Sequence, residues 1–289
     1  MSPFGERLSA LVAARGPLVV GIDPHPPLLA SWGLSVDVSG LERFALTVVE
    51  AVGDRVAVMK PQSAFFERFG SGGVAVLERT LAAIRAAGAL SIVDVKRGDI
   101  GSTTAGYAAA YLDPASPLAA DAMTASPYLG FGSLGPLLDT AYEHGGGVFV
   151  LALTSNPQGA AVQRATGPDG RTVAQAILDQ AAEANAAELA RTGGTLGSVG
   201  VVVGATVGRH GHRLGHLRGP VLAPGLGAQG AGAADLPEVF GPALPWVLPS
   251  VSREVLGAGP DPDAVRAVTA RMAAEVHAIG AQTLTGTGR

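Results

Sequence analysis

The chain contains no cysteine, and only two of its 20 basic residues are lysines, Lys60 and Lys96. Without cysteine, disulfide bonds, thiolate catalysis and cysteine-ligated zinc sites are excluded. The scarcity of lysine is informative, because arginine cannot release a proton at useful pH whereas lysine can act as an acid or a nucleophile. We therefore expect both lysines to stand where an ammonium group is needed.

Charge is also scarce, since charged residues make up 15% of the 289 residues and the net charge is −4. No long basic run is present to meet a phosphate backbone, so nucleic acid is not expected as a partner. No apolar run approaches the length of a membrane span, and the first 15 residues lack the features of a secretory signal. These absences predict a cytoplasmic protein that does not contact membranes.

Apolar and turn-forming residues are abundant: hydrophobic residues make up 47% of the chain, with 41 glycines and 20 prolines. This composition favours a globular protein with a large core and many tight turns. No linker divides the chain, so we expect one domain over residues 1–289, with a frayed tail near residues 282–289. The polar segment Thr154–Thr172 is expected to form an enlarged loop.

Short β-branched runs alternate with segments of helical periodicity along the chain. The predicted strands are Leu18–Asp23, Val56–Lys60, Leu90–Val95, Ala120–Ala125, Gly147–Leu153, Val199–Ala205, Val221–Ala223 and Trp246–Pro249. The predicted helices are Leu41–Val52, Gly73–Ala87, Ser102–Tyr111, Leu134–His144, Thr172–Arg191 and Pro262–Ile279. Eight such repeats favour an α/β fold with a parallel sheet closed into a single (β/α)8 TIM barrel; an open doubly wound sheet is the alternative.

Polar residues at the ends of the predicted strands are the candidate site, because barrels of this class carry their active sites there. Residues two apart on a strand share a face, so Asp94 and Lys96 are both expected to point into the barrel mouth. Lys60 on the neighbouring strand adds a second ammonium group. Asp99 follows after a turn, where it can reach the same site or that of a neighbouring subunit. Desolvation makes buried ion clusters weak stabilisers, so a functional array is favoured over a purely structural one.

The run Asp94–Thr104, DVKRGDIGSTT, resembles the signature of the orotidine 5′-phosphate decarboxylases. Further segments are similar to that family in the expected order: Gly21–Pro24, Lys60–Gln62, Leu153–Pro157, Leu222–Gly230 and Ser252–Arg253. The resemblance therefore covers most of the chain. The long segment Gln158–Arg171 resembles the longer, type 2 branch of the family.

The resemblance implies a TIM-barrel enzyme that converts orotidine 5′-monophosphate to uridine 5′-monophosphate and CO2 in pyrimidine synthesis, with no cofactor and no metal. It implies that Lys96 protonates C6 of the pyrimidine and that Asp94 sits beside the substrate carboxylate. Lys60 would contact the ribose and orient the array. Asp99 would reach the ribose from the second subunit of a homodimer with shared active sites.

The resemblance also implies contacts to the rest of the nucleotide. Asp23 and the partner subunit's Thr103 would contact the ribose, and Ser155 would bond the pyrimidine. The phosphate would be held by the eighth-strand end and by a Gly-rich loop with its backbone N–H groups, through Gln229, Arg253, Gly225 and Gly227.

Three other readings stay open. A metal-dependent sugar-phosphate decarboxylase or aldolase of the same barrel superfamily would carry a metal-binding carboxylate where Lys60 stands. A non-catalytic phosphate-ligand binding barrel would not need paired lysines and carboxylates. A Schiff-base aldolase would need Lys96 neutral, whereas flanking carboxylates keep it protonated. The basic segment from Arg209 to His216 is expected to be a surface helix start rather than a metal site.

Overall fold

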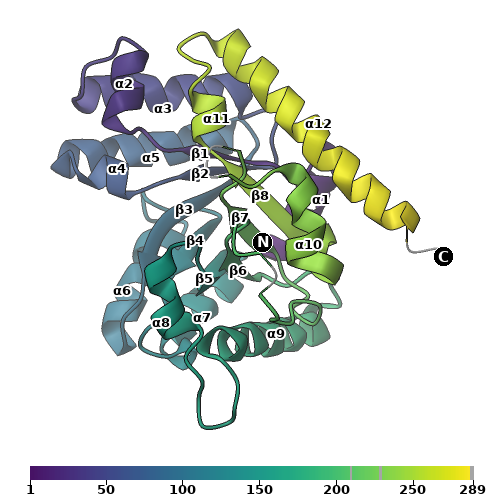
Figure 1. The fold of residues 1–289 in the computed structure, drawn as a ribbon. Coiled ribbons are helices and arrows are strands. Elements are labelled where there is room, and N and C mark those ends of the chain that lie inside the picture. The colour runs from purple at the N-terminus through teal and green to yellow at the C-terminus, as the bar shows by residue number, and fades with distance from the viewer. Residues whose placement is uncertain (209, 228–229, 287–289) are drawn as a thin grey trace.

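The computed structural model describes residues 1–208, 210–227 and 230–286. Eight parallel strands close into a barrel in chain order, so the predicted TIM barrel is confirmed and the open sheet is wrong (Figure 1). The strands are β1 Val19–Ile22, β2 Val58–Pro61, β3 Leu90–Arg97, β4 Ala122–Ala125, β5 Gly147–Leu153, β6 Val199–Val203, β7 Val221–Pro224 and β8 Val247–Val251.

Helices surround the barrel on its outside (Figure 1). The six predicted helices are α3 Val38–Val52, α5 Gly70–Ala86, α6 Gly101–Leu112, α7 Gly135–His144, α9 Val173–Thr192 and α12 Pro262–Gly286. Shorter ones are α2 Pro26–Ser31, α4 Ala64–Glu67, α10 Leu236–Phe240 and α11 Arg253–Leu256. Within the described part of the chain, none of the helices has both the length and the apolar character needed to cross a membrane.

The C-terminal helix runs further than the sequence predicts. α12 continues through Gly286 instead of stopping at Ile279, so residues 282–286 of the expected frayed tail are helical. Residues 287–289 lie outside the described residues. The sequence after Ile279 contains glycine and threonine, which are weak helix formers, so intrinsic propensity does not predict this extension.

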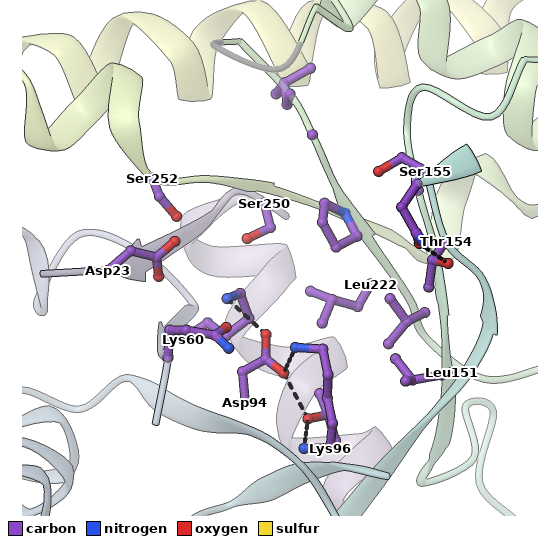
Figure 2. A pocket seen from close by; sticks show the side chains of 18 of the residues that line it. Asp23, Lys60, Asp94, Lys96, Leu151, Thr154, Ser155, Leu222, Ser250 and Ser252 are labelled. Atoms are coloured by element: carbon purple, nitrogen blue, oxygen red, sulfur yellow. Dashed lines mark hydrogen bonds and ion pairs between the residues drawn. The ribbon is translucent and has the colours of Figure 1, made fainter. Parts of the chain in front are cut away.

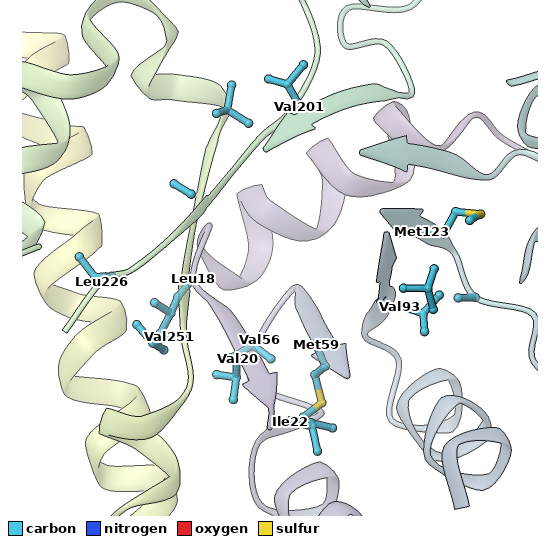
Figure 3. Packing of buried hydrophobic residues seen from close by; sticks show 14 of the residues in the cluster. Leu18, Val20, Ile22, Val56, Met59, Val93, Met123, Val201, Leu226 and Val251 are labelled. Carbon is cyan, nitrogen blue, oxygen red and sulfur yellow. The ribbon is translucent and has the colours of Figure 1, made fainter. Parts of the chain in front are cut away.

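Strand residues alternate between two apolar layers. Val93 packs outward among the helices, in the same layer as Met59 and Met123 (Figure 3). Val95 belongs to the same cluster. Ile92 points inward, into a second apolar cluster toward the N-terminal ends of the strands. Helix α1, Phe4–Arg15, belongs to that inner cluster, where Phe4 meets Phe149 edge to face with ring centroids 5.9 Å apart. Apolar packing at this end leaves the opposite end of the barrel for polar side chains.

The enlarged loop after β5 is present and has structure of its own. It contains the 3-10 turn Pro157–Gly159, the short helix α8 Ala160–Gln163, and a bridge that pairs Thr166 with Thr172. Thr172 also caps α9 by accepting a hydrogen bond from the Gln175 backbone N–H at 3.1 Å. The loop is therefore an ordered wall beside the barrel mouth.

The predicted helix start after β6 is wrong, because the described residues from 210 to 216 form no helix. Gly208 and Gly211 both adopt positive φ, at 63° and 71°, and a helix cannot pass through such positions. The His212 ring Nε2 lies 2.9 Å from the Thr172 hydroxyl, so this segment is tied to the loop after β5. Arg209 lies outside the described residues.

Candidate active site

A cavity of about 500 Å³ opens at the C-terminal ends of the strands. Polar side chains from four neighbouring strands line it: Asp23 after β1, Lys60 on β2, Asp94 and Lys96 on β3, and Thr124 on β4 (Figure 2). Parallel strands in a barrel all end at the same rim, which is why residues from 23 to 124 meet there.

Asp94 is the centre of the charged array. Its Oδ2 lies 3.3 Å from the Lys60 ammonium and its Oδ1 lies 2.5 Å from the Lys96 ammonium (Figure 2). Lys60 is only 4% exposed, whereas the Lys96 side chain is 44% exposed and faces the open cavity. The two lysines therefore differ in accessibility: Lys60 is buried in the wall, and Lys96 is open to solvent.

The neighbouring charges keep Asp94 and Lys60 ionised. Burial favours the neutral form of Asp94, but the charges of Lys60 and Lys96 and the hydrogen bonds from Lys96 and Thr124 hold its pKa below the usual value. Burial likewise opposes the charge on Lys60, yet Asp23 and Asp94 raise its pKa above the usual value. The wall thus presents fixed charges in a partly desolvated site, where they act more strongly than in water.

Asp23 has an unmet hydrogen-bonding capacity. Its Oδ1 is buried and, within the described part of the chain, has no hydrogen-bond partner. A buried acceptor without a donor is costly, so such an atom at a cavity wall is suited to a ligand hydroxyl. The Ser252 side chain approaches the backbone closely here, since a Cβ on Gly21 would lie 2.0 Å from its hydroxyl.

The sequence predicts that Lys96 reaches the cavity by regular strand alternation, but the structure differs. Its φ is 48°, in the left-handed region, and the pairing of β3 with β4 is irregular between Val93 and Arg97. The backbone N–H groups of Val95 and Lys96 both donate to the Thr124 hydroxyl, at 3.0 and 2.9 Å. The expected direction of the Lys96 side chain is right, but a bulge produces it.

Thr124 is a site residue that the sequence reasoning missed. Its hydroxyl donates to Asp94 Oδ1 at 2.8 Å, and the side chain lines the cavity. The signal was present, because Thr124 is the polar residue in the otherwise apolar end of β4. The resemblance directed attention to the third and seventh strands instead.

The loop after β5 forms a further part of the wall. Ser155 lines the cavity, as predicted, together with Thr154 and Asn156. Gln163 of α8 holds this turn: its Oε1 accepts from the Thr154 backbone N–H at 3.0 Å, and its Nε2 donates to the Thr154 hydroxyl at 2.7 Å. Gly159 leaves room for this contact, because a Cβ there would lie 2.8 Å from the Thr154 hydroxyl.

The predicted phosphate residues are only partly brought together. Arg253 and Gly225 line the cavity. Gly227 lies in a separate hollow beside Glu254, and its N–H donates to the Ala231 carbonyl at 2.8 Å rather than pointing to a ligand. Gln229 falls outside the described residues, so its predicted contact stays a prediction.

Asp99 and Thr103 do not line the cavity of their own chain. Asp99 is half-buried and accepts a hydrogen bond from the Ile100 N–H at 2.8 Å, and Thr103 is exposed. Ile100, which follows Asp99 in the chain, is 62% exposed, and Tyr128, which follows β4, is 79% exposed. Elsewhere in the described ranges, no group of three or more His, Asp or Glu side chains is arranged to hold a metal ion.

Comparison with known proteins identifies the family. A family model described as the orotidine 5′-phosphate decarboxylase / HUMPS family matches residues 16–268. A protein from Salinispora arenicola named orotidine 5′-phosphate decarboxylase is 66% identical over 278 residues, covering 96% of this chain and 98% of the relative. A relative of the same name from Streptomyces coelicolor is 60% identical over 278 residues, with the same coverage.

Solved structures agree with this result. A crystal structure from Streptomyces avermitilis, provisionally named orotidine 5′-phosphate decarboxylase, superposes with a TM-score of 0.93 at 60% identity and covers 97% of each chain. The structure of Leishmania donovani OMP decarboxylase superposes with a TM-score of 0.74 at 30% identity, over 96% of this chain and 98% of that one. The chain belongs to the orotidine 5′-phosphate decarboxylase / HUMPS family.

Proposed function

We propose that this chain decarboxylates orotidine 5′-monophosphate to uridine 5′-monophosphate, and that Lys96 delivers the proton to C6. The observation that carries the proposal is the placement of the Lys96 ammonium, which lies 2.5 Å from Asp94 on a cavity-lining side chain that is 44% exposed. The 66% identity to a relative of that name supports the activity. The reaction belongs to pyrimidine synthesis, and we place the protein in the cytoplasm with it.

The reaction breaks the bond between C6 and the carboxylate. The electron pair stays on C6, CO2 leaves, and the Lys96 Nζ supplies the proton that takes its place; the neutral amine then regains a proton from water. A carbanion on this ring carbon is poorly delocalised, so a fixed positive charge at C6 lowers the barrier as the negative charge develops. The same group then acts as the general acid.

Asp94 stands where it can act on the ground state. A substrate carboxylate beside it brings two negative charges together, and that repulsion is relieved when CO2 departs. A pair of unit charges about 4 Å apart interacts by roughly 4 kcal/mol at an effective dielectric near 20. Barrier reductions on the order of 20 kcal/mol exceed that, so binding energy from the rest of the nucleotide has to contribute.

The rest of the cavity offers suitable groups for the nucleotide. The unpartnered Oδ1 of Asp23 suits a ribose hydroxyl, with Lys60 beside it. Ser155 and Arg253 both line the cavity; the Ser155 hydroxyl suits a hydrogen bond to the pyrimidine, and the Arg253 guanidinium suits a phosphate. Gln229 and the Gly-rich loop near Gly225 complete this proposal.

The competing readings fit the site less well. The metal-dependent sugar-phosphate reading needs a carboxylate at the second strand, where a buried Lys60 ammonium lies 3.3 Å from Asp94. A Schiff-base aldolase needs a Lys96 amine free to attack a carbonyl, whereas the Lys96 Nζ lies 2.5 Å from the Asp94 carboxylate in an ion pair. A non-catalytic phosphate-binding barrel would not need the alternating charges of Lys60, Asp94 and Lys96.

The test is the ultraviolet absorbance change when purified, chelator-treated protein meets orotidine 5′-monophosphate. We expect turnover to uridine 5′-monophosphate by the native chain. In Lys96→Ala we expect kcat to fall on the order of 1,000-fold or more, because charge stabilisation and proton delivery both disappear. Phosphate-free orotidine should react far more slowly than the nucleotide if remote binding contributes. No turnover by native protein would contradict the proposed activity, and added magnesium with sugar phosphates would then be tried.

We further propose a homodimer in which each subunit completes the other's site. Asp99 and Thr103 do not line the cavity of their own chain, and Ile100, Tyr128 and Leu129 are large apolar side chains exposed at the surface. Exposed apolar side chains of this size fit a contact with a second copy of the chain. Mixing inactive Lys96→Ala and Asp99→Ala chains should restore part of the activity through hybrid sites. No recovery despite subunit exchange would exclude the shared site.

A further inference from the structure

Thr124 joins the proton donor to its carboxylate partner through a single oxygen atom. The side chain lies on β4, is 1% exposed, and lines the cavity. Its hydroxyl donates to Asp94 Oδ1 at 2.8 Å and accepts from the backbone N–H groups of Val95 at 3.0 Å and Lys96 at 2.9 Å. A hydroxyl has one donor and two acceptor lone pairs, so the full capacity of this group is used on β3.

The β3 backbone at this point is irregular. Between the pairs Val93–Met123 and Arg97–Ala125, β3 advances by four residues while β4 advances by two. The extra residues of β3 lie opposite Thr124, which is the one β4 position between those pairs. The Val95 and Lys96 N–H groups consequently bond to the Thr124 side chain rather than to a strand carbonyl.

Lys96 adopts a left-handed backbone conformation, which is intrinsically unfavourable for a lysine. Its φ of 48° is uncommon for a residue with a Cβ, because the Cβ crowds the neighbouring backbone in this region. It persists only when its surroundings hold it, and the hydrogen bonds to Thr124 are contacts of that kind. Strain of this type is concentrated at sites where a side chain must be aimed.

We propose that Thr124 is a positioning residue for the Lys96 ammonium. By holding both N–H groups and the Asp94 carboxylate on one oxygen, it sets the distance and direction between Nζ and the place where C6 is protonated. Thr124 acts through Lys96 and Asp94 and transfers no proton itself. The inference rests on the proposed decarboxylation and deepens it.

The test compares two substitutions that differ in the hydroxyl. Thr124→Val keeps the volume and the β-branching but removes all three hydrogen bonds, whereas Thr124→Ser keeps the hydroxyl and loses only a methyl group. We expect Thr124→Val to lower kcat on the order of 100-fold, as a misplaced catalytic group does, with KM changed less than about threefold. Thr124→Ser should stay within about fivefold of the native kcat.

A matched control is available at Thr80, a buried threonine on α5 whose hydroxyl donates to the Val76 carbonyl at 2.8 Å. Thr80→Val makes the same chemical change outside the cavity and should leave both kcat and KM unchanged. A crystal structure of Thr124→Val should show φ of Lys96 returned to negative values. If that variant does not fold, Thr124→Ala and its structure carry the same test.

The outcomes separate the inference from the function on which it rests. Native activity with a Thr124→Val variant of equal kcat overturns the positioning role. Equal losses in Thr124→Val and Thr124→Ser overturn it too, because the hydroxyl would then not be the cause. A lowered kcat with φ of Lys96 unchanged also counts against it. An inactive native protein would instead contradict the proposed decarboxylation.

Discussion

Replacement of Asp94 by asparagine removes a buried carboxylate that two lysines share, while keeping the volume of the side chain. The amide oxygen can still accept the hydrogen bond from Thr124, which reaches Asp94 Oδ1 at 2.8 Å. What is lost is the negative charge beside Lys60 and Lys96. The variant therefore isolates the electrostatic part of the array.

The loss of stability expected in Asp94→Asn follows from the two ion pairs of Asp94, with Lys60 and with Lys96. At 3.3 Å and an effective dielectric of about 20, the Lys60–Asp94 attraction is roughly 5 kcal/mol before desolvation is subtracted. Breaking a buried pair leaves a buried charge uncompensated and costs about 3–5 kcal/mol. The Lys96 contact adds little, because that side chain is 44% exposed and screened by solvent. We expect the free energy of unfolding of Asp94→Asn to fall by about 3 kcal/mol at pH 7.

The dependence on pH has a definite sign. The folded pKa of Asp94 lies below its usual value of 3.8, so its contribution is fully present above the unfolded value and is lost as pH falls through the folded pKa. The stability difference between the native chain and Asp94→Asn should therefore be constant from pH 8 to about pH 5 and narrow only below that.

Urea unfolding followed by circular dichroism measures this difference. Asp54→Asn is the control, because Asp54 has 68% of its side chain exposed and lies 3.7 Å from Arg55, also at the surface. That change should alter the free energy of unfolding by less than about 1 kcal/mol. A loss below about 1 kcal/mol in Asp94→Asn, or a difference that narrows already between pH 7 and pH 5, would refute the reasoning.

Two further predictions concern the loops around the cavity. Gln163→Ala should lower kcat/KM about tenfold, because Thr154 loses its two hydrogen bonds to Gln163. Gln158→Ala on the same loop should have little effect in the same steady-state assay. Burial holds the pKa of both His210 and His212 below 6.5, so the stability that the neutral rings provide is present above that pH and lost as pH falls. Denaturant unfolding from pH 8 to pH 5 measures this loss. The free energy of unfolding should fall less steeply with pH in the His210→Asn, His212→Gln double variant than in the native chain, and equal slopes would contradict this.

Much of the fold follows from periodicity along the chain. All eight predicted strands overlap observed ones, because a short β-branched run between turns reports its own local environment. The helix predicted near His210 failed because composition said nothing of the positive φ at Gly208 and Gly211. The end of α12 was misplaced because the segment after Ile279 is rich in glycine and threonine, whose low helix propensity predicts an earlier end.

The candidate site, like the fold, could be predicted from the sequence only in part. The sequence by itself determined the kinds of group at the strand ends, since Lys60, Asp94 and Lys96 stand where any closed barrel of this order would bring them together. Only the tertiary structure decided how they are held. Thr124 lies 30 positions from Asp94 in the chain, and its bonds to β3 depend on an irregular strand pairing that no local pattern encodes. Contacts between distant segments over-determine the left-handed Lys96, and such contacts exist only once the barrel has closed.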